Sequence, residues 1–259
     1  MKVAASSICW AHETLEGAVR KAAAAGFTAF EPLTFPSEIW DLHGDLRKVK
    51  GRDIQRLCAD HGLTIVGLHL GAIMTPSEER RRVLTDYAKL AVDVAGEIGC
   101  KTIVEGGPDR GTVQPFKPFL KSLEELAAYV DGTDVRIALE NHYGNWLQGI
   151  EDYEHVFDYV NHPNIGMTLD TGHFTSAEVD PQRVAEKFTA KVFHVHIKDH
   201  IGRESVELGK GATNNRGVAS VLKAAGYKGY FSQELEVHDG SQADRVAAEG
   251  IGYMTKLVE

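Results

Sequence analysis

Apolar, β-branched runs alternate along this chain with longer segments in which apolar residues recur at helical spacing. The runs predict strands at residues 2–7, 29–33, 64–70, 102–105, 136–140, 166–170, 192–197 and 229–234. The segments between them predict helices at residues 15–25, 53–61, 78–98, 117–130, 150–160, 181–188, 217–225 and 245–257. Strands that alternate with helices favour a parallel sheet, and eight such units predict an α/β protein. We expect a single (β/α)8 TIM barrel that occupies residues 1–259 as one domain.

The ends of the predicted helices support this division. Glycines that follow a helical pattern and precede a strand are typical of left-handed C-caps, and the chain has four: Gly26, Gly62, Gly99 and Gly226. Residues suited to N-caps precede three helices: Thr14, Ser77 and Asp180. An open doubly wound sheet is the main alternative, but no GxGxxG pattern follows the first strand.

The composition is that of an ordinary globular chain, with 43% hydrophobic and 25% charged residues. No apolar run approaches the roughly 20 residues of a membrane span, and no secretory signal pattern opens the chain. Three cysteines without CxxC pairing, Cys9, Cys58 and Cys100, indicate small core residues in a reduced protein. We therefore expect a cytoplasmic protein without a membrane partner, and a homo-oligomer is left open.

The net charge of −9 argues against binding to nucleic acid or to anionic lipid. The nearest basic cluster is Arg80-Arg81-Arg82, at the start of a predicted helix. We expect these three side chains on a solvated helix face. No nucleic-acid partner is therefore expected.

Four apolar runs in the second half of the chain end in a carboxylate or an imidazole, at Glu140, Asp170, His196 and Glu234. A buried strand has no use for a charge inside it, but its last residue can project into a pocket that all strands share. The pattern predicts one divalent metal site. Three carboxylates and one imidazole suit Mn²⁺, the ion that we expect, and also Mg²⁺, Co²⁺ or Zn²⁺.

Further residues near predicted strand ends are expected to contact substrate. His69 and Glu105 close two strands, and His173 follows Asp170 by three residues, where it could also support or ligate the metal. Trp146 could stack on a sugar ring, with simple packing as the alternative. Lys198 could hold a phosphate or a carboxylate, although a cation in a loop is usually solvated.

His194 and His196 alternate on one strand and point to the same side. His194 lies deeper and could be a hydrogen-bonded histidine of the barrel interior. A cation at the predicted site would polarise a carbonyl and stabilise the enediolate that forms when the neighbouring carbon loses its proton. Glu140 and Glu234 could serve as acid and base on two faces of a bound sugar, which suits epimerisation or isomerisation.

These positions also carry a family resemblance. The segments Leu139-Glu140-Asn141-His142, Leu169-Asp170-Thr171-Gly172-His173, His194-Val195-His196-Ile197-Lys198-Asp199 and Gln233-Glu234 resemble motifs of the sugar phosphate isomerase/epimerase superfamily with a xylose isomerase-like TIM barrel. That superfamily includes ketose 3-epimerases, hydroxypyruvate isomerases, inosose dehydratases and endonuclease IV. The resemblance implies the same four metal ligands, proton transfer by Glu140 and Glu234, and substrate contacts from His173 and from Arg203 in a loop.

The chain departs from the ketose 3-epimerases in two places. They usually carry a second Glu shortly after the position of Glu140, where this chain has Asn145-Trp146-Leu147. Many relatives also have a Gly-acidic-Gly segment in the seventh loop, which reads Gly209-Lys210-Gly211 here. The substrate could therefore differ from a free ketohexose.

The predicted function is a metal-dependent isomerase or epimerase of a small sugar or keto-sugar. The alternative is a metal-dependent lyase or dehydratase, which would form the same enolate and then expel a β-substituent from a keto-sugar, an inosose or a dehydroshikimate-type substrate. An endonuclease IV-like nuclease for abasic DNA and a non-catalytic sugar-binding barrel are further alternatives. The acidic net charge disfavours the nuclease, and the complete ligand set disfavours the binding protein.

Overall fold

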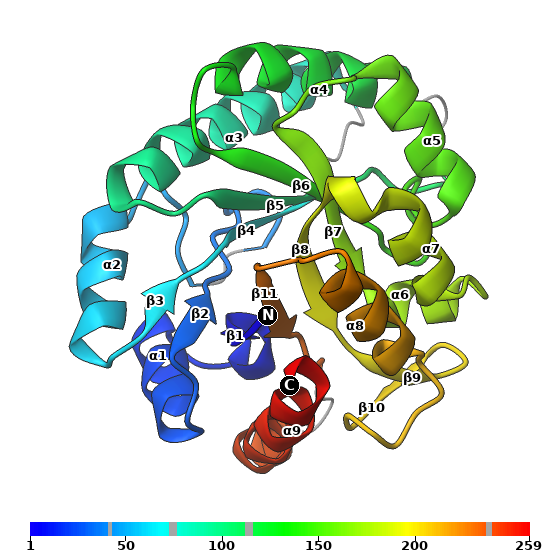
Figure 1. Ribbon diagram of the computed structural model, residues 1–259. Coiled ribbons are helices and arrows are strands. Elements are labelled where there is room, and N and C mark those ends of the chain that lie inside the picture. Colours follow the sequence, from blue (N-terminus) through cyan, green and yellow to red (C-terminus); the bar gives the residue numbers. More distant parts are fainter. Residues whose placement is uncertain (41–42, 73–76, 112–115, 237–239) are drawn as a thin grey trace.

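The computed structural model describes residues 1–40, 43–72, 77–111, 116–236 and 240–259. Its main sheet consists of parallel strands in the order β3-β2-β1-β11-β8-β7-β6-β5-β4, which curl into a nearly closed barrel (Figure 1). They are β1 (Lys2–Ser6), β2 (Ala29–Glu31), β3 (Thr64–Ile65), β4 (Leu68–Ala72), β5 (Thr102–Gly106), β6 (Arg136–Glu140), β7 (Ile165–Asp170), β8 (Val192–Ile197) and β11 (Tyr230–Gln233). The predicted TIM barrel is confirmed.

The sheet is open between its two edge strands, β3 and β4, near the end of β2. There Leu33 forms a parallel bridge with His69, and the N–H of Thr34 donates to the His69 carbonyl at 2.7 Å. The predicted third strand is interrupted at Val66 and Gly67: its first part, β3, pairs with β2, and its second part, β4, pairs with β5. The interruption lets one chain segment join both edges of the opening.

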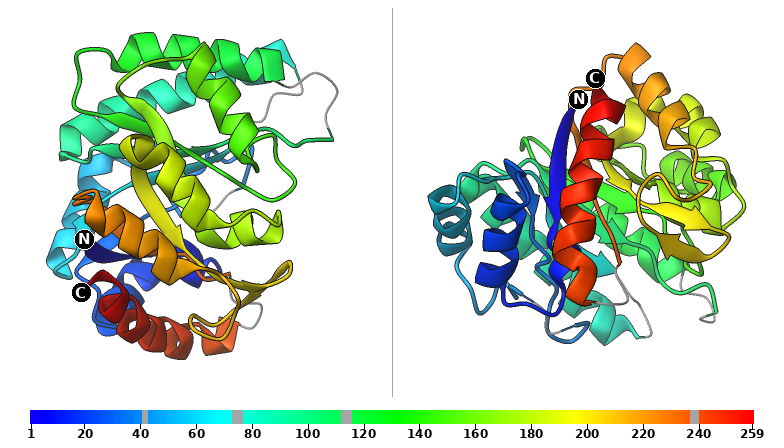
Figure 2. Two further views of the ribbon diagram at one scale, coloured as in Figure 1. Left: turned by 45° about the vertical axis from the view of Figure 1, so that its right-hand side comes forward. Right: turned by 90° about the horizontal axis from the view of Figure 1, so that it is seen from below.

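Helices surround the barrel (Figures 1 and 2). They are α1 (Leu15–Ala24), α2 (Gly51–Asp60), α3 (Glu78–Ile98), α4 (Phe116–Val130), α5 (Ile150–Tyr159), α6 (Thr171–Ser176), α7 (Pro181–Phe188), α8 (Asn215–Ala224) and α9 (Ala243–Val258). Short 3-10 helices span Ser7–Trp10, Thr189–Lys191 and Gly240–Gln242. The predicted N-caps Thr14, Ser77 and Asp180 all accept a backbone N–H, and the four predicted C-cap glycines all have positive φ.

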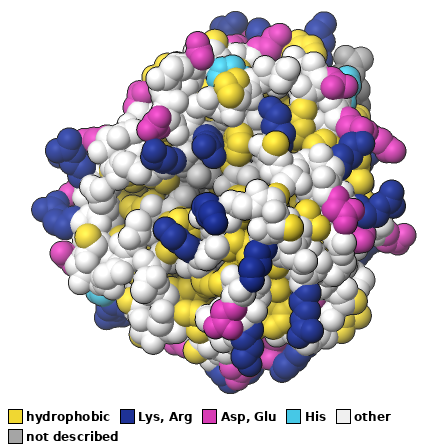
Figure 3. All heavy atoms as spheres, in the orientation of Figure 1, with side chains coloured by type: hydrophobic (Ala, Val, Ile, Leu, Met, Phe, Trp, Pro, Cys, Tyr) yellow, Lys and Arg dark blue, Asp and Glu magenta, His cyan; other side chains and the backbone are white. Residues whose placement is uncertain are grey.

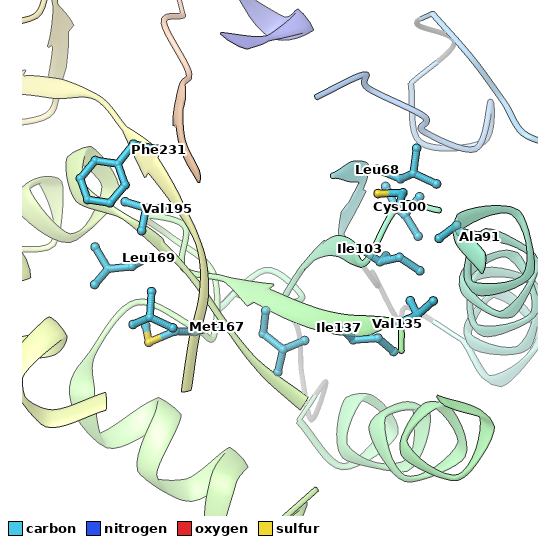
Figure 4. Packing of buried hydrophobic residues seen from close by; sticks show 14 of the residues in the cluster. Leu68, Ala91, Cys100, Ile103, Val135, Ile137, Met167, Leu169, Val195 and Phe231 are labelled. Carbon is cyan, nitrogen blue, oxygen red and sulfur yellow. The ribbon is translucent and has the colours of Figure 1, made fainter. Parts of the chain in front are cut away.

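Side chains on successive strand residues alternate between the helix layer and the barrel interior. In β6, Ile137 and Leu139 join the hydrophobic core beneath the helices, so Ala138 and Glu140 face the interior. The register pairs Leu139 with Met167 and Glu140 with Thr168, which keeps the two faces aligned across strands. Figure 4 shows this packing around Ile137, Met167 and their neighbours. The interior face can therefore carry polar groups toward the C-terminal ends of the strands.

Two features after the strands β7 and β8 were not predicted from the sequence pattern. The helix α6 starts directly after β7, and an antiparallel hairpin of β9 (Asp199–Ile201) and β10 (Glu204–Val206) comes after β8. Both segments are too short to show a clear hydrophobic period. They extend the rim of the barrel on the side where β7 and β8 end.

The expectation of a solvated face for the three arginines was wrong for Arg81. Its side chain is 2% exposed, and its guanidinium donates to Glu78 at 2.8 Å and to Ser122 at 3.2 Å. It also pairs with Glu125 at 2.9 Å, which joins α3 to α4. A buried arginine is tolerated because carboxylates and a hydroxyl satisfy its donors.

The three cysteines are free and buried, as expected. Burial raises the pKa of each thiol to about 12, so they are unreactive core residues. Among the described residues, no helix is both long and apolar enough to cross a lipid bilayer.

The two chain ends lie side by side at the end of the barrel where the strands begin (Figures 1 and 2). Figure 3 shows this face, on which Lys and Arg side chains are spread across the surface while Asp and Glu gather mainly toward its edge. The carboxyl ends of the strands open on the opposite side of the molecule.

Candidate active site

The four predicted metal ligands come together at the C-terminal ends of neighbouring strands. Ligand atoms of Glu140, Asp170, His196 and Glu234 all lie within 4.8 Å of one another, and all four residues are buried. Glu140, Asp170 and His196 lie on β6, β7 and β8, and Glu234 directly follows β11. These four strands are consecutive in the sheet. The expected convergence is thus present, although ligation itself stays a prediction.

Asp170 is held rigidly. The amide side chain of Asn141 grips its backbone, with the Asp170 N–H donating to Oδ1 at 2.8 Å and Nδ2 donating to the Asp170 carbonyl at 2.9 Å. Oδ1 of Asp170 accepts the N–H of His173 at 2.7 Å and so caps α6. The other oxygen, Oδ2, is buried and receives no hydrogen bond from a described residue. Burial and the carboxylates of Glu234 and Glu140 raise the pKa of Asp170 to about 8, although Lys198 opposes the rise.

His196 faces two carboxylates at once. Its Nδ1 lies 2.5 Å from Oε1 of Glu140 and 3.1 Å from Oε2 of Glu234. Nε2 of His69 approaches the other oxygen of Glu140 at 3.3 Å. Burial alone would raise the pKa of Glu140, but His196 and His69 hold it well below its usual range.

A buried lysine stands against the same cluster. Nζ of Lys198 lies 2.9 Å from Oε2 of Glu234, 3.3 Å from Oδ2 of Asp170 and 3.0 Å from Oε1 of Glu236. It also lies 2.9 Å from Nε2 of His173. Burial disfavours the ammonium, but Asp170 and Glu234 outweigh burial and raise the pKa of Lys198 well above its usual range.

The donor set fits a hard divalent cation. Two buried carboxylate oxygens in it, Oδ2 of Asp170 and Oε2 of Glu234, receive no hydrogen bond of good geometry from a described residue. The Lys198 ammonium lies near both oxygens, at ion-pair distance, without the alignment of a hydrogen bond. Buried carboxylate oxygens that lack hydrogen-bond donors are what a metal site requires, and the ammonium supplies positive charge beside them in its place.

A cavity of about 280 Å³ opens onto this cluster. Three predicted substrate residues line it: His69, His173 and Lys198. Glu140 and Glu234 also reach it, and Phe35 and Trp40 form an apolar wall. One side of the cavity therefore carries carboxylates, imidazoles and an ammonium, and the other side carries aromatic rings. Such a lining would suit a small polar ring.

Three other predicted substrate residues lie elsewhere, since Glu105, Trp146 and Arg203 are not among the described residues that line the cavity. Trp146 packs on Phe116 with ring centroids 5.3 Å apart. Arg203 is exposed in the turn between β9 and β10, with its guanidinium over the Tyr143 ring at 4.6 Å.

Glu105 is buried, but it pairs in register with Leu139, which faces the helices. The strand runs one residue further than predicted, so Gly106 takes the place beside Glu140. A shift of one residue moves a side chain to the other face of the sheet.

Two residues of the site were not singled out from the sequence. Glu236 lines the cavity and contacts Lys198, and Asn141 fixes the backbone of Asp170. The spacing offered a signal for Glu236, because a residue two positions after Glu234 shares its side in an extended chain. Asn141 directly follows a strand end, but nothing in a single sequence identifies its bidentate contact.

The xylose isomerase-like TIM barrel family matches residues 19–257 of this chain. An inosose dehydratase of Geobacillus thermodenitrificans is 25% identical over 213 residues, which cover 68% of this chain and 70% of that protein. A 3-dehydroshikimate dehydratase of Pseudomonas aeruginosa is 26% identical over 269 residues, which cover 95% of this chain but only 39% of that longer protein.

Among solved structures, the IOLI protein with a bound zinc atom superimposes with a TM-score of 0.81 at 20% identity. The match covers 100% of this chain and 98% of that one, and it demonstrates a shared fold. From residue 19 to residue 257, the chain belongs to the xylose isomerase-like TIM barrel family.

Proposed function

We propose that this chain is a divalent-metal-dependent lyase that dehydrates a small polyhydroxylated ketone. The observation that carries the proposal is the buried ammonium of Lys198, which lies 2.9 Å from Glu234 and beside Glu236 and His173, two further polar groups of the cavity. An elimination needs a base for the proton next to the carbonyl and an acid for the departing hydroxyl. The two dehydratases that resemble the chain at 25% and 26% identity support the same choice.

Glu140, Asp170, His196 and Glu234 would hold the cation. When bound there, a divalent cation would act as a Lewis acid toward the substrate carbonyl and so make the neighbouring C–H more acidic. Mn²⁺ remains our expectation, and the zinc atom of the IOLI protein makes Zn²⁺ the first alternative.

Glu234 is the proposed base. Its carboxylate takes the proton from the carbon next to the carbonyl, and the electron pair of that C–H bond becomes the enolate. The enolate then re-forms the carbonyl, a carbon–carbon double bond forms, and the bond to the β-hydroxyl breaks. The products are an unsaturated ketone and one molecule of water.

Lys198 is the proposed acid for the departing hydroxyl, which would otherwise leave as hydroxide. After donation its amine can take back the proton that Glu234 received, because the two atoms lie 2.9 Å apart. His173 accepts a hydrogen bond from Nζ of Lys198 at 2.9 Å and keeps it in place. The site thereby returns to its starting protonation state.

Isomerisation or epimerisation, our first expectation from the sequence, is the second candidate. It is favoured by the presence of both Glu140 and Glu234 at the cavity surface, where one could remove a proton and the other return it. This reaction would leave Lys198 without a chemical step. The two candidates share the enolate and differ in its fate, which is loss of a hydroxyl in one and reprotonation in the other.

Product analysis separates the candidates. Protein loaded with Mn²⁺ or Zn²⁺ would be incubated with an inosose, 3-dehydroshikimate and free ketohexoses, and the products analysed by mass spectrometry and NMR. We expect a product lighter than its substrate by one water molecule. A product of unchanged mass would support the isomerase, and nicking of an abasic DNA duplex in a parallel reaction would support the nuclease.

A further inference from the structure

A fully buried carboxylate lies in the barrel interior beneath the metal ligands. Glu31, the last residue of β2, is 0% exposed, and its carboxylate accepts hydrogen bonds from two imidazoles. Nε2 of His194 lies 2.9 Å from its Oε2, and Nε2 of His196 lies 3.0 Å from its Oε1. Because β1 and β11 separate β2 from β8, these contacts reach across the barrel interior.

Both ring nitrogens of His196 face carboxylates: Nε2 faces Glu31, and Nδ1 faces Glu140 and Glu234. A carboxylate only accepts hydrogen bonds, so Nε2 of His196 must be the N–H that donates to Glu31. By the same rule Nδ1 donates to Glu140 when no cation is bound. A cation among the carboxylates of Glu140 and Glu234 would take the place of that hydrogen on Nδ1, and Nε2 would keep its own. A metal ion binds the unprotonated nitrogen of an imidazole.

From this geometry we infer that Glu31 is a positioning residue for the cation: it orients His196 so that Nδ1 faces the ligand cluster. The inference rests on the proposed metal binding. His194 completes the arrangement, because it holds the second oxygen of Glu31 and its ring meets the ring of His196 edge-on, with centroids 5.2 Å apart at 89°. Carboxylates that orient ligand histidines typically raise metal affinity about 10- to 100-fold.

Glu31, His69 and His196 could alternatively form a second metal site, since their ligand atoms also lie within 4.8 Å of one another. The hydrogen bonds argue against this reading. Both oxygens of Glu31 already have imidazole N–H partners, and a metal at this place would have to displace them. One cation per chain is therefore expected.

The test is the affinity of purified Glu31→Gln protein for Mn²⁺ and Zn²⁺ without substrate, by titration against a chelating indicator. We expect one ion per chain in the wild type and affinity about 10- to 100-fold weaker in the variant. Glu105→Gln is the matched control, because Glu105 is also a buried carboxyl of a barrel strand but does not line the cavity, and it should bind like the wild type. Wild-type affinity in Glu31→Gln, or two ions per wild-type chain, would overturn the inference.

A second measurement needs no variant. In ¹⁵N-labelled wild-type protein loaded with Zn²⁺, long-range ¹H–¹⁵N spectra report the state of each ring nitrogen. We expect a protonated Nε2 and a metal-bound Nδ1 for His196, and metal on Nε2 would refute the role of Glu31. If the wild type binds no metal at all, the proposed function fails, which is a different outcome from metal bound through the other nitrogen.

Discussion

Nζ of Lys198 lies 2.9 Å from Nε2 of His173, and both side chains are buried beside the carboxylates of Asp170 and Glu234. Burial and the nearby ammonium lower the pKa of His173 well below its usual range, so the neutral imidazole accepts the hydrogen bond from lysine. The lysine is therefore held in one place at the cavity wall. Its position makes it the most informative single residue to change.

Lys198→Met should remove the acid and keep the volume. We expect kcat for dehydration to fall by about 10²- to 10⁴-fold, the usual effect of losing a general acid. Cation affinity should stay equal or increase, because the ammonium competes for Asp170 and Glu234. Steady-state kinetics and a metal titration on the same sample would test both. Unchanged kcat would remove Lys198 from the mechanism.

Glu234→Gln should prevent abstraction of the substrate proton. In D₂O, the metal-loaded wild type should exchange the hydrogen next to the substrate carbonyl, and the variant should not, as followed by NMR. Glu140→Gln should likewise abolish turnover. Metal content must be measured in both, because each change also removes a proposed ligand. Near-wild-type exchange in Glu234→Gln would show that the base is assigned wrongly.

Asp170→Asn should remove most of the dependence of thermal stability on bound metal. A ligand that binds only the folded state at 100 times its Kd stabilises it by about 2.7 kcal/mol, so a chelator should lower the Tm of the loaded wild type. The variant should lose most of this shift. Its asparagine can still cap α6 through Oδ1, as Asp170 does toward His173. Metal-free variant should be less stable than metal-free wild type, because Nδ2 would replace Oδ2 beside the buried Lys198 ammonium, which would lose that carboxylate partner. An equal chelator effect in both proteins would contradict the ligand assignment.

The contacts of Asp45, which lies away from the active site, lead us to expect that the stability of the protein depends on pH. Its carboxylate accepts from the N–H of Ser37 at 3.0 Å and from Nε of Arg47 at 2.9 Å. Burial opposes the charge, but Arg47 and Ser37 hold the pKa of Asp45 well below its usual range. Its stabilising contribution is therefore complete above the unfolded value of about 3.9 and is lost as the pH falls below it.

Asp45→Asn should consequently lower Tm at pH 7, and the difference from wild type should shrink toward pH 3. Glu38→Gln, which removes an exposed partner of the same arginine, should change stability by less than about 1 kcal/mol. Thermal unfolding followed by circular dichroism at the two pH values would measure this. A difference in Tm between Asp45→Asn and wild type that grows as the pH falls would contradict this prediction.

Gly172→Ala should damage the site through packing. An added Cβ would lie 2.5 Å from Cβ of Lys198 and 2.6 Å from the His200 ring, so the lysine would have to move. We expect lower Tm and lower kcat. Gly96→Ala is the matched control in α3. Apart from the backbone of α3 itself, no atom lies within 4 Å of a Cβ added there, so the change should stabilise the protein by about 0.5–1 kcal/mol. Unchanged kcat in Gly172→Ala would show that Lys198 tolerates displacement.

The alternation of strand and helix patterns was sufficient to predict the barrel and the convergence of Glu140, Asp170, His196 and Glu234. Each of these positions follows from local periodicity plus one topological rule, that strand ends share a face. Glu105 does not line the cavity because its strand runs one residue further than predicted, and strand ends are the least certain part of such a prediction. A difference of one residue in the strand end therefore places the Glu105 side chain on the other face of the sheet.

The contacts of Glu31 could not be predicted in the same way. The sequence places Glu31 and His194 163 positions apart, and only the closed barrel brings their side chains within hydrogen-bond distance. Arg81 is a similar case, because its burial depends on how α4 packs on α3. Pairings of this kind depend on tertiary structure and leave no periodic signal.

The neighbouring chain ends, at the strand-start side of the barrel, make the molecule suited to circular permutation (Figures 1 and 2). A short flexible linker from residue 259 to residue 1 would leave the mouth of the cavity unobstructed. New termini could be opened in the exposed turn at Gly202 between β9 and β10, and a permutant that folds would still unite its ligands from strands on both sides of the old junction.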